Sequence, residues 1–343
     1  MEGQFYALPL EVPGECDPID PDSAHICALA AASDGRLVWG ATRGCTSHIF
    51  AACFKGAAGG IIDTGMLPEN TEGVHLLALP AGHALAGSGS HTVIAGVTTP
   101  RGFSLWRQSF TVPRDVVQEP NFCHPAPECI VEPSAGRCLG LGLLDRTVCC
   151  LTDGGLFALA SGSPGGLQAI HTEAPCPITP LAILNESAWW VDEEGRLTGC
   201  LADGTIHSWH PLLTNDTQVT TLIAEPAGKL LAVLPDGCLV ALDPETEEIT
   251  PAGAIPLSHV QCLVPLPDGR VYGLCGSGIG HFFRADLSSN TSAALGAVAT
   301  AVSNHRYAFT FSCAPVTSDG TILFGEDDRG GHLWMYYPPL LRL

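Results

Sequence analysis

Three histidines occupy the same position in a repeated sequence pattern. His48, His281 and His332 each follow a glycine-rich loop and precede two apolar residues, and they lie 14, 13 and 13 residues after the aspartate of an Asp-Gly-containing turn. An imidazole that recurs with a repeat is typical of the repeat's architecture, in which it opens a strand and donates a ring N–H to a backbone carbonyl. We expect this structural role. The alternative is a functional set in neighbouring repeats.

A second set of histidines is better placed for metal chemistry. His25, His75 and His259 each precede the apolar run that we expect to be the innermost strand of its repeat. Imidazoles that converge at the ends of inner strands suit a divalent metal such as manganese, zinc or calcium, with further coordination positions open to substrate or water. Histidines at a solvated rim are the alternative.

Arginines provide a third candidate site. Arg43 and Arg329 lie in corresponding loops of two repeats, and a pair of guanidinium groups could seat a carboxylate. Tyr307 or His332 beside such an arginine could remove the α-proton of a uronate. The alternative is a turn held by salt bridges. Trp106 and the Trp189-Trp190 pair could stack on a sugar ring, although a β-rich core also uses large aromatic residues.

The elements that must position these residues are short strands. Apolar runs are bounded by Asp-Gly, Pro-Gly and Gly-Gly, and no stretch keeps helical spacing over three turns. Asp-Gly pairs begin at positions 34, 153, 203, 236, 268 and 319, and this dipeptide favours type I′ hairpin turns. The sequence therefore predicts an all-β protein.

The repeats predict a single β-propeller over residues 1–343. Units of about 40 to 50 residues with three or four strands match a propeller blade. Seven blades are expected, near residues 22–71, 72–118, 119–173, 174–216, 217–256, 257–299 and 300–343, and six or eight remain alternatives. A β-sandwich and a β-helix fit the repeat less well. The apolar segment at residues 4–10 is expected to close the last blade, because pairing there removes two open strand edges.

The charge and cysteine composition limits the classes of partner and the cellular location that we expect. The formal net charge is −20, with 35 acidic against 15 basic residues, which disfavours nucleic acid and anionic membranes as partners. The start of the sequence shows no signal peptide, and no apolar run is long enough to span a membrane. The 15 cysteines are an odd number without CxxC spacing, which favours reduced thiols and a cytoplasmic location.

The motifs Asp268-Gly-Arg, Tyr272-Gly273 and Gly280-His-Phe-Phe-Arg-Ala-Asp resemble bacterial seven-bladed propellers with loosely kelch-like repeats. Oligogalacturonate lyases and other polysaccharide-lyase propellers share this pattern. The resemblance implies a manganese ion held by histidines at the channel mouth, to which His25, His75 and His259 would correspond.

Two classes of function follow. One is a metal-assisted lyase or hydrolase that acts on an acidic oligosaccharide through Tyr307, Arg329, Arg43 and His332. The other is a non-catalytic propeller that binds a saccharide or a protein, or serves as a scaffold. Histidines that converge with Arg and Tyr beside them would favour the first class. An aromatic site with satisfied histidines would favour the second.

Overall fold

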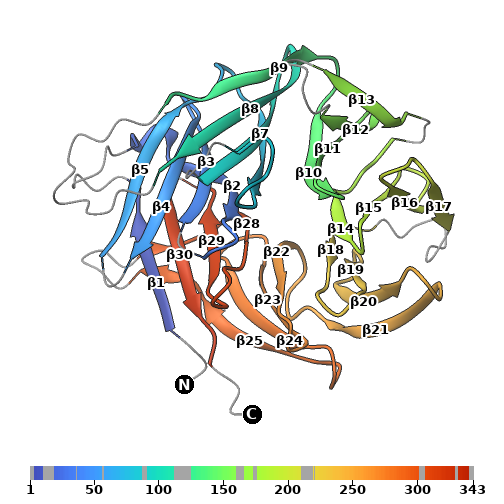
Figure 1. The fold of residues 1–343 in the computed structure, drawn as a ribbon. Coiled ribbons are helices and arrows are strands. Elements are labelled where there is room, and N and C mark those ends of the chain that lie inside the picture. The colour runs from blue at the N-terminus through green and yellow to red at the C-terminus, as the bar shows by residue number, and fades with distance from the viewer. Residues whose placement is uncertain are drawn as a thin grey trace. The chain divides into compact units, whose positions relative to one another are not determined.

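The computed structural model describes residues 4–10, 19–35, 37–55, 58–86, 91–111, 125–159, 166–172, 176–209, 219, 221–300, 306–328 and 331–339. Within these residues the chain forms seven four-stranded antiparallel sheets, which are the blades of an all-β propeller (Figure 1). The expected fold class and the number of blades are confirmed. No helix among the described residues has the length and apolar character needed to cross a membrane.

The chain divides into two compact units, of which the first comprises Met1–Ala135, Ser161–Gly165 and Phe311–Leu343. It holds three blades. The first blade consists of β2 (His25–Ala31), β3 (Leu37–Arg43), β4 (His48–Lys55) and β5 (Ala58–Met66). The second consists of β6 (Gly73–Leu79), β7 (His91–Thr99), β8 (Gly102–Phe110) and β9 (Glu128–Ser134). The last consists of β28 (Phe311–Cys313), β29 (Ile322–Glu326), β30 (His332–Tyr337) and β1 (Gln4–Pro9). A short 3-10 turn, η1, covers Pro21–Ser23.

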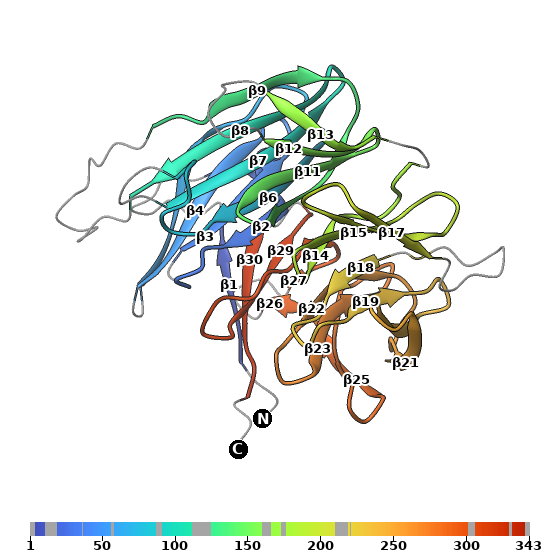
Figure 2. The same ribbon diagram turned by 45° about the vertical axis from the view of Figure 1, so that its right-hand side comes forward.

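The second unit comprises Gly136–Ala160 and Gly166–Thr310 and holds four blades (Figure 2). The first and second of these blades consist of β10 (Cys138–Leu144), β11 (Thr147–Thr152), β12 (Gly155–Leu159) and β13 (Leu167–His171), and of β14 (Ala182–Leu184), β15 (Ser187–Val191), β16 (Leu197–Leu201) and β17 (Ile206–Trp209). The third consists of β18 (Thr221–Ala224), β19 (Leu230–Val233), β20 (Cys238–Asp243) and β21 (Glu248–Ala254). The fourth consists of β22 (Val260–Pro265), β23 (Arg270–Cys275), β24 (His281–Asp286) and β25 (Thr291–Ala297). The short strands β26 (Ala299–Thr300) and β27 (Arg306–Tyr307) pair separately.

The N-terminal strand closes the last blade of the first unit, as expected. β1 pairs antiparallel with β30 from Gln4 opposite Tyr337 to Pro9 opposite His332. The ring of Phe5 lies 6.0 Å from that of Phe324 and 5.1 Å from that of Tyr336, so aromatic packing adds to the ladder. The closing strand therefore gives β30 a partner on its second edge.

The second strand of each blade is buried on both faces, as in β3, β15 and β23, where successive residues that point to opposite sides of the sheet are all buried or nearly so. On β3, Trp39 packs in one core cluster with Val93 and Phe110 of the next blade. The adjacent Val38 packs in a different cluster with Leu323 and Leu333 of the last blade. The sequence accordingly shows continuous apolar runs in these strands rather than alternation.

Glycines that recur on second strands make room for aromatic rings on third strands. Gly40 lies opposite Phe50 in the β3–β4 ladder, and a Cβ atom at Gly40 would overlap the Phe50 ring. In the second unit Gly273 and Phe283 repeat this arrangement, with a Cβ atom 2.8 Å from the ring. Gly40 and Gly273 are thus packing requirements of their blades.

Two details differ from the sequence-based expectation. First, the Asp-Gly hairpins are not type I′ turns: Gly35, Gly204, Gly237, Gly269 and Gly320 have positive φ, but the aspartates before them do not. The aspartate instead accepts a backbone hydrogen bond two residues on, as Asp268 does from Arg270 N at 3.1 Å, which fits a type I turn followed by a left-handed glycine. The pairs Asp145-Arg146 and Asn185-Glu186, with both φ values positive, form the I′-like turns.

The second difference concerns a blade boundary. Cys129–Val131 was expected in the third blade, but these residues belong to β9, the outer strand of the second blade, which pairs with β8. A short apolar triplet does not reveal its partner strand, because any blade can use it as a fourth strand. The second blade therefore extends to Ser134.

We predict that Gly40→Ala lowers the free energy of unfolding by about 1–3 kcal/mol, because the added methyl group overpacks a fully buried ring. Chemical denaturation followed by circular dichroism measures the effect. The double variant Gly40→Ala/Phe50→Leu should recover part of the loss, since leucine vacates the space. An unchanged unfolding midpoint for the single variant would contradict the packing argument.

Candidate pocket on the second blade

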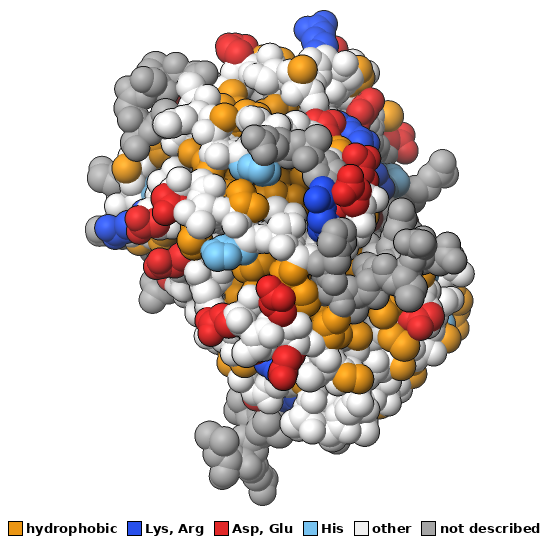
Figure 3. Space-filling model, turned by 90° about the vertical axis from the view of Figure 1, so that its right-hand side faces the viewer, with side chains coloured by type: hydrophobic (Ala, Val, Ile, Leu, Met, Phe, Trp, Pro, Cys, Tyr) orange, Lys and Arg blue, Asp and Glu red, His pale blue; other side chains and the backbone are white. Residues whose placement is uncertain are grey.

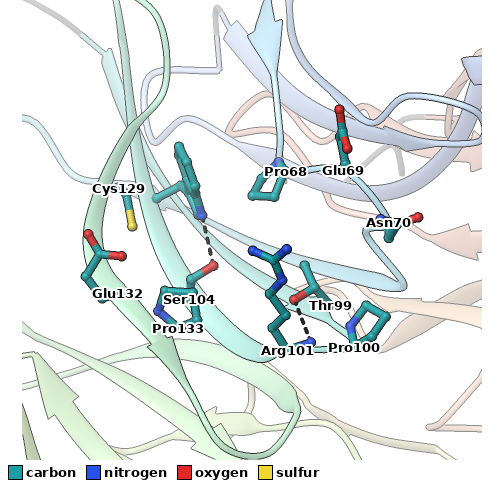
Figure 4. A pocket seen from close by; sticks show the side chains of 11 residues that line it. Pro68, Glu69, Asn70, Thr99, Pro100, Arg101, Ser104, Cys129, Glu132 and Pro133 are labelled. Atoms are coloured by element: carbon teal, nitrogen blue, oxygen red, sulfur yellow. Dashed lines mark hydrogen bonds between the residues drawn. The ribbon is translucent and has the colours of Figure 1, made fainter.

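A pocket of about 460 Å³ lies on the second blade of the first unit (Figure 4). Four structural elements line it: the loop between β5 and β6, the turn between β7 and β8, strand β8 and strand β9. The lining residues are Pro68, Glu69, Asn70, Thr99, Pro100, Arg101, Ser104, Trp106, Cys129, Glu132 and Pro133. The volume lies within the usual range of small-molecule sites.

Local hydrogen bonds hold the walls of the pocket. The indole Nε1 of Trp106 donates to Ser104 Oγ at 2.9 Å, and Trp106 also packs against the core cluster between the first two blades of the unit. At the turn, the backbone N–H of Arg101 donates to Thr99 Oγ1 at 3.2 Å, and that hydroxyl donates to Gly102 O at 3.1 Å. The aromatic wall and the arginine turn are therefore fixed by the fold.

The charged groups of the pocket are not paired with one another. No ion pair joins Arg101, Glu69 or Glu132 to any other side chain in the described part of the chain. Figure 4 shows the Arg101 side chain between Glu132 on one side and Glu69 on the other. All three residues are exposed, so one guanidinium and two carboxylates are available to a ligand.

The thiol in the pocket is not an activated nucleophile. Burial, together with the negative charge of Glu132, raises the pKa of Cys129, and its Sγ donates to Val131 O at 3.2 Å. A nucleophilic cysteine needs a lowered pKa. The arrangement therefore suits binding rather than covalent chemistry.

Arg43, which was predicted to seat a substrate carboxylate, is bound to a carboxylate of the protein. Its Nε donates to Asp327 Oδ1 at 2.8 Å and its Nη2 to Asp327 Oδ2 at 2.7 Å. The Asp327 side chain is only 5% exposed, against 47% for Arg43. Burial raises the pKa of Asp327, whereas Arg43 and, to a smaller degree, His25 oppose this rise. The geometry matches the alternative of a salt-bridged turn.

The three repeated histidines begin the third strands of their blades, as expected. His281 Nδ1 donates to the Ile279 carbonyl at 2.8 Å, which is the predicted architectural bond. His332 and His48 instead contact carboxylates, Glu326 Oε2 at 2.6 Å and Asp63 Oδ2 at 2.8 Å. Glu326 also accepts from Trp334 Nε1 at 3.0 Å, and burial raises its pKa. His332, predicted as a catalytic residue, therefore contributes to a buried hydrogen-bond network.

Two of the three histidines predicted to bind metal lie on inner strands, and His259 immediately precedes β22. His25 begins β2 and His75 lies in β6, both in the first unit and half-buried, whereas His259 belongs to the second unit, is exposed and has φ 70°. Among the described residues no three His, Cys, Asp or Glu side chains gather closely enough to hold a metal ion. Manganese, zinc or calcium at this set stays a prediction.

The remaining predicted residues belong to different units or lie outside the described residues. Tyr307 is 40% exposed on β27 and belongs to the second unit, whereas Arg43 and His332 belong to the first. Arg329 lies outside the described residues. Trp189 and Trp190 are 6% and 2% exposed core residues, so Trp106 alone of these three tryptophans lines the pocket.

Sequence reasoning missed Arg101, Glu69 and Glu132. Arg101 follows Pro100 in the turn that joins two strands, and its sequence is typical of any solvent-exposed hairpin turn. Glu132 enters the pocket through β9, the strand that the sequence assigned to the neighbouring blade. Only the pairing of β9 with β8 brings it beside Trp106.

We predict that Arg43→Ala lowers the free energy of unfolding at neutral pH by about 1–2 kcal/mol, because it leaves a buried carboxylate without its cation. Without Arg43 the pKa of Asp327 rises further above that of an aspartate in the unfolded chain. The variant therefore keeps its stability below the ordinary aspartate range near pH 4, where the carboxyl group is protonated in both states, and loses stability as the pH rises and the group ionises. Denaturation at several pH values should show the deficit shrinking on acidification. In an Asp327→Asn background, removal of Arg43 should have a small and pH-independent effect, and a pH-independent deficit with Asp327 intact would contradict the assignment.

Comparisons with known proteins agree with the fold. No family model and no curated protein sequence matches the chain. Among solved structures, catalytically inactive virginiamycin B lyase from Staphylococcus aureus with quinupristin has a TM-score of 0.63 at 11% identity, over 98% of this chain and 100% of that one. The structure of YCF48 bound to D1 peptide has a TM-score of 0.63 at 14% identity, over 98% and 97%. The WD40 β-propeller domain of Doa1 has a TM-score of 0.62 at 12% identity, over 92% and 93%. These likenesses establish the seven-bladed propeller fold alone.

Proposed function

We propose that the protein is a non-catalytic binding propeller that holds a saccharide in the pocket on the second blade. The observation that carries this proposal is a tryptophan, Trp106, held by Ser104 in a pocket whose guanidinium and two carboxylates form no ion pair with any described residue. An aromatic ring provides the surface on which the apolar face of a sugar stacks. Carboxylate, amide and hydroxyl groups around it accept and donate hydrogen bonds to sugar hydroxyls.

The charge of the pocket refines the ligand class. Arg101 can form a bidentate contact with one carboxylate, but Glu69 and Glu132 give the lining a net excess of one negative charge. A second ligand carboxylate would meet a glutamate rather than an arginine. We therefore propose a neutral or singly acidic saccharide, and not a fully acidic polymer.

The geometry supports binding better than catalysis. The lyase expected from the sequence needs a guanidinium free to receive the substrate carboxylate, and Arg43 is committed to Asp327. Both pocket glutamates are exposed, so their carboxylates are placed to accept hydrogen bonds from ligand hydroxyl groups. Fold neighbours include propellers solved with quinupristin and with a peptide, which supports the use of this fold as a ligand platform.

The distribution of acidic side chains supports a scaffold for basic partners less well than it supports a saccharide-binding protein. On the face drawn in Figure 3, acidic side chains are spread among apolar and neutral ones and form no single patch. A basic partner recognised by charge would need a concentrated acidic surface. The net charge of −20 is in accord with solubility.

Calorimetry on the full chain tests the proposal with neutral, singly uronylated and fully uronylated oligosaccharides of one length. We expect the first two to bind and the third to bind more weakly. Trp106→Ala should weaken binding of both bound ligands by about tenfold or more, which corresponds to about 1.4 kcal/mol. Arg101→Ala should weaken only the singly acidic ligand.

Tyr6→Ala is the matched control, because Tyr6 is an exposed aromatic residue, 52% accessible, on a different blade. It should bind as the wild type does. Saccharide binding that survives Trp106→Ala would place the site elsewhere. If none of the three classes bound, the saccharide proposal would be wrong.

A further inference from the structure

Two buried thiols face each other in the first blade of the second unit. Cys138 Sγ and Cys150 Sγ are 3.6 Å apart, and the residues are 4% and 1% exposed. They lie on the adjacent strands β10 and β11, so the ladder fixes their separation. Neither residue belongs to the pocket or to the repeated histidine positions.

The register explains why these two cysteines meet and Cys149 does not join them. Thr152 lies opposite Cys138 and Cys150 opposite Leu141, with a β-bulge just after Cys138. Residues two apart share a face of the sheet, so Cys150 and Thr152 lie on the face of Cys138. Cys149 points to the other face, where it packs with Cys200 in a core cluster.

The separation is close to that of a disulfide. Bonded sulfurs are about 2.05 Å apart, so the two atoms need to approach by about 1.5 Å. Cys138 is the first residue of β10, follows the exposed Arg137 and precedes the bulge, where the ladder is already irregular. Movement at a strand end disturbs fewer ladder hydrogen bonds than movement at its centre.

The surroundings keep the pair as thiols until an oxidant is supplied. The hydrogen bond with Cys138 and burial raise the pKa of Cys150 well above the ordinary thiol range. Since the thiolate is the reactive species, exchange is slow at neutral pH and needs opening of the strand end. Such a pair forms a disulfide during long exposure to an oxidant rather than during brief exposure.

We propose that Cys138 and Cys150 form an intrasheet disulfide in the presence of a small disulfide oxidant such as oxidised glutathione. The Cys138 thiolate attacks one sulfur of the oxidant and releases one thiolate, which takes up a proton. The Cys150 thiolate then attacks the Cys138 sulfur and releases the second. In sum, two protein thiols lose two electrons and two protons, and one disulfide oxidant becomes two thiols.

Peptide mapping of the full chain tests this inference. After incubation with oxidised glutathione at neutral pH, free thiols are alkylated, the protein is digested without reduction and the linked peptides are identified by mass spectrometry. We expect a linked peptide that contains Cys138 and Cys150, and two fewer alkylated thiols than in the reduced protein. The oxidised form should unfold at a temperature a few degrees higher, because the bond closes a loop in the unfolded chain.

Two pairs of variants sharpen the test. Cys138→Ala and Cys150→Ala should each lose the linked peptide, whereas Cys149→Ala and Cys200→Ala, which alter the other face, should keep it. The wild-type map does not depend on any variant folding. A map in which both thiols stay alkylated after prolonged oxidation, or in which either is linked to another cysteine, would overturn the inference.

Discussion

The structure depends on the burial of both faces of the central strands in each four-stranded sheet. Alternation along a strand sends neighbouring residues into different core clusters, as with Trp39 and Val38 on β3. A sheet with two apolar faces is not stable alone, so each blade needs covering on both sides. This constraint explains the continuous apolar runs, the recurrent glycines under aromatic rings and the use of the N-terminal strand to complete the last blade.

Because apolar packing fills the central strands, polar side chains that can contact a ligand lie at the ends and outer edges of the sheets. A buried carboxylate is costly without a partner, and two buried carboxylates of the described structure are paired within the protein, Asp327 with Arg43 and Glu326 with His332. These groups have the residue types of a catalytic site, but their hydrogen bonds are made within the protein. Arg101 and Glu132 lie at a turn and on an outer strand, are exposed and form no ion pair within the described part of the chain, and they contribute to the proposed binding function.

The cysteines illustrate how a ladder gives similar residues different properties. Cys149 and Cys150 are adjacent in sequence, but alternation places the first in a core cluster and the second against Cys138. Burial raises the pKa of Cys149 to about 12, so it behaves as a small apolar side chain. Its neighbour has a sulfur partner within bonding reach after a small movement. The chemistry of each thiol follows from the face on which it lies.

The sequence by itself determined the all-β class, the seven repeats, the closing role of residues 4–10 and the strand-opening positions of His48, His281 and His332. All of these depend on local patterns: turn dipeptides, apolar runs and a repeat in register, which act over a few residues. The tertiary structure alone decided that Asp327 pairs with Arg43, that β9 joins the second blade and that Glu132 lines the same pocket as Trp106. These outcomes depend on pairing between residues distant in sequence, and the residue types permit several pairings. Only the packed fold selects which charges are neutralised inside the protein and which remain available to a ligand.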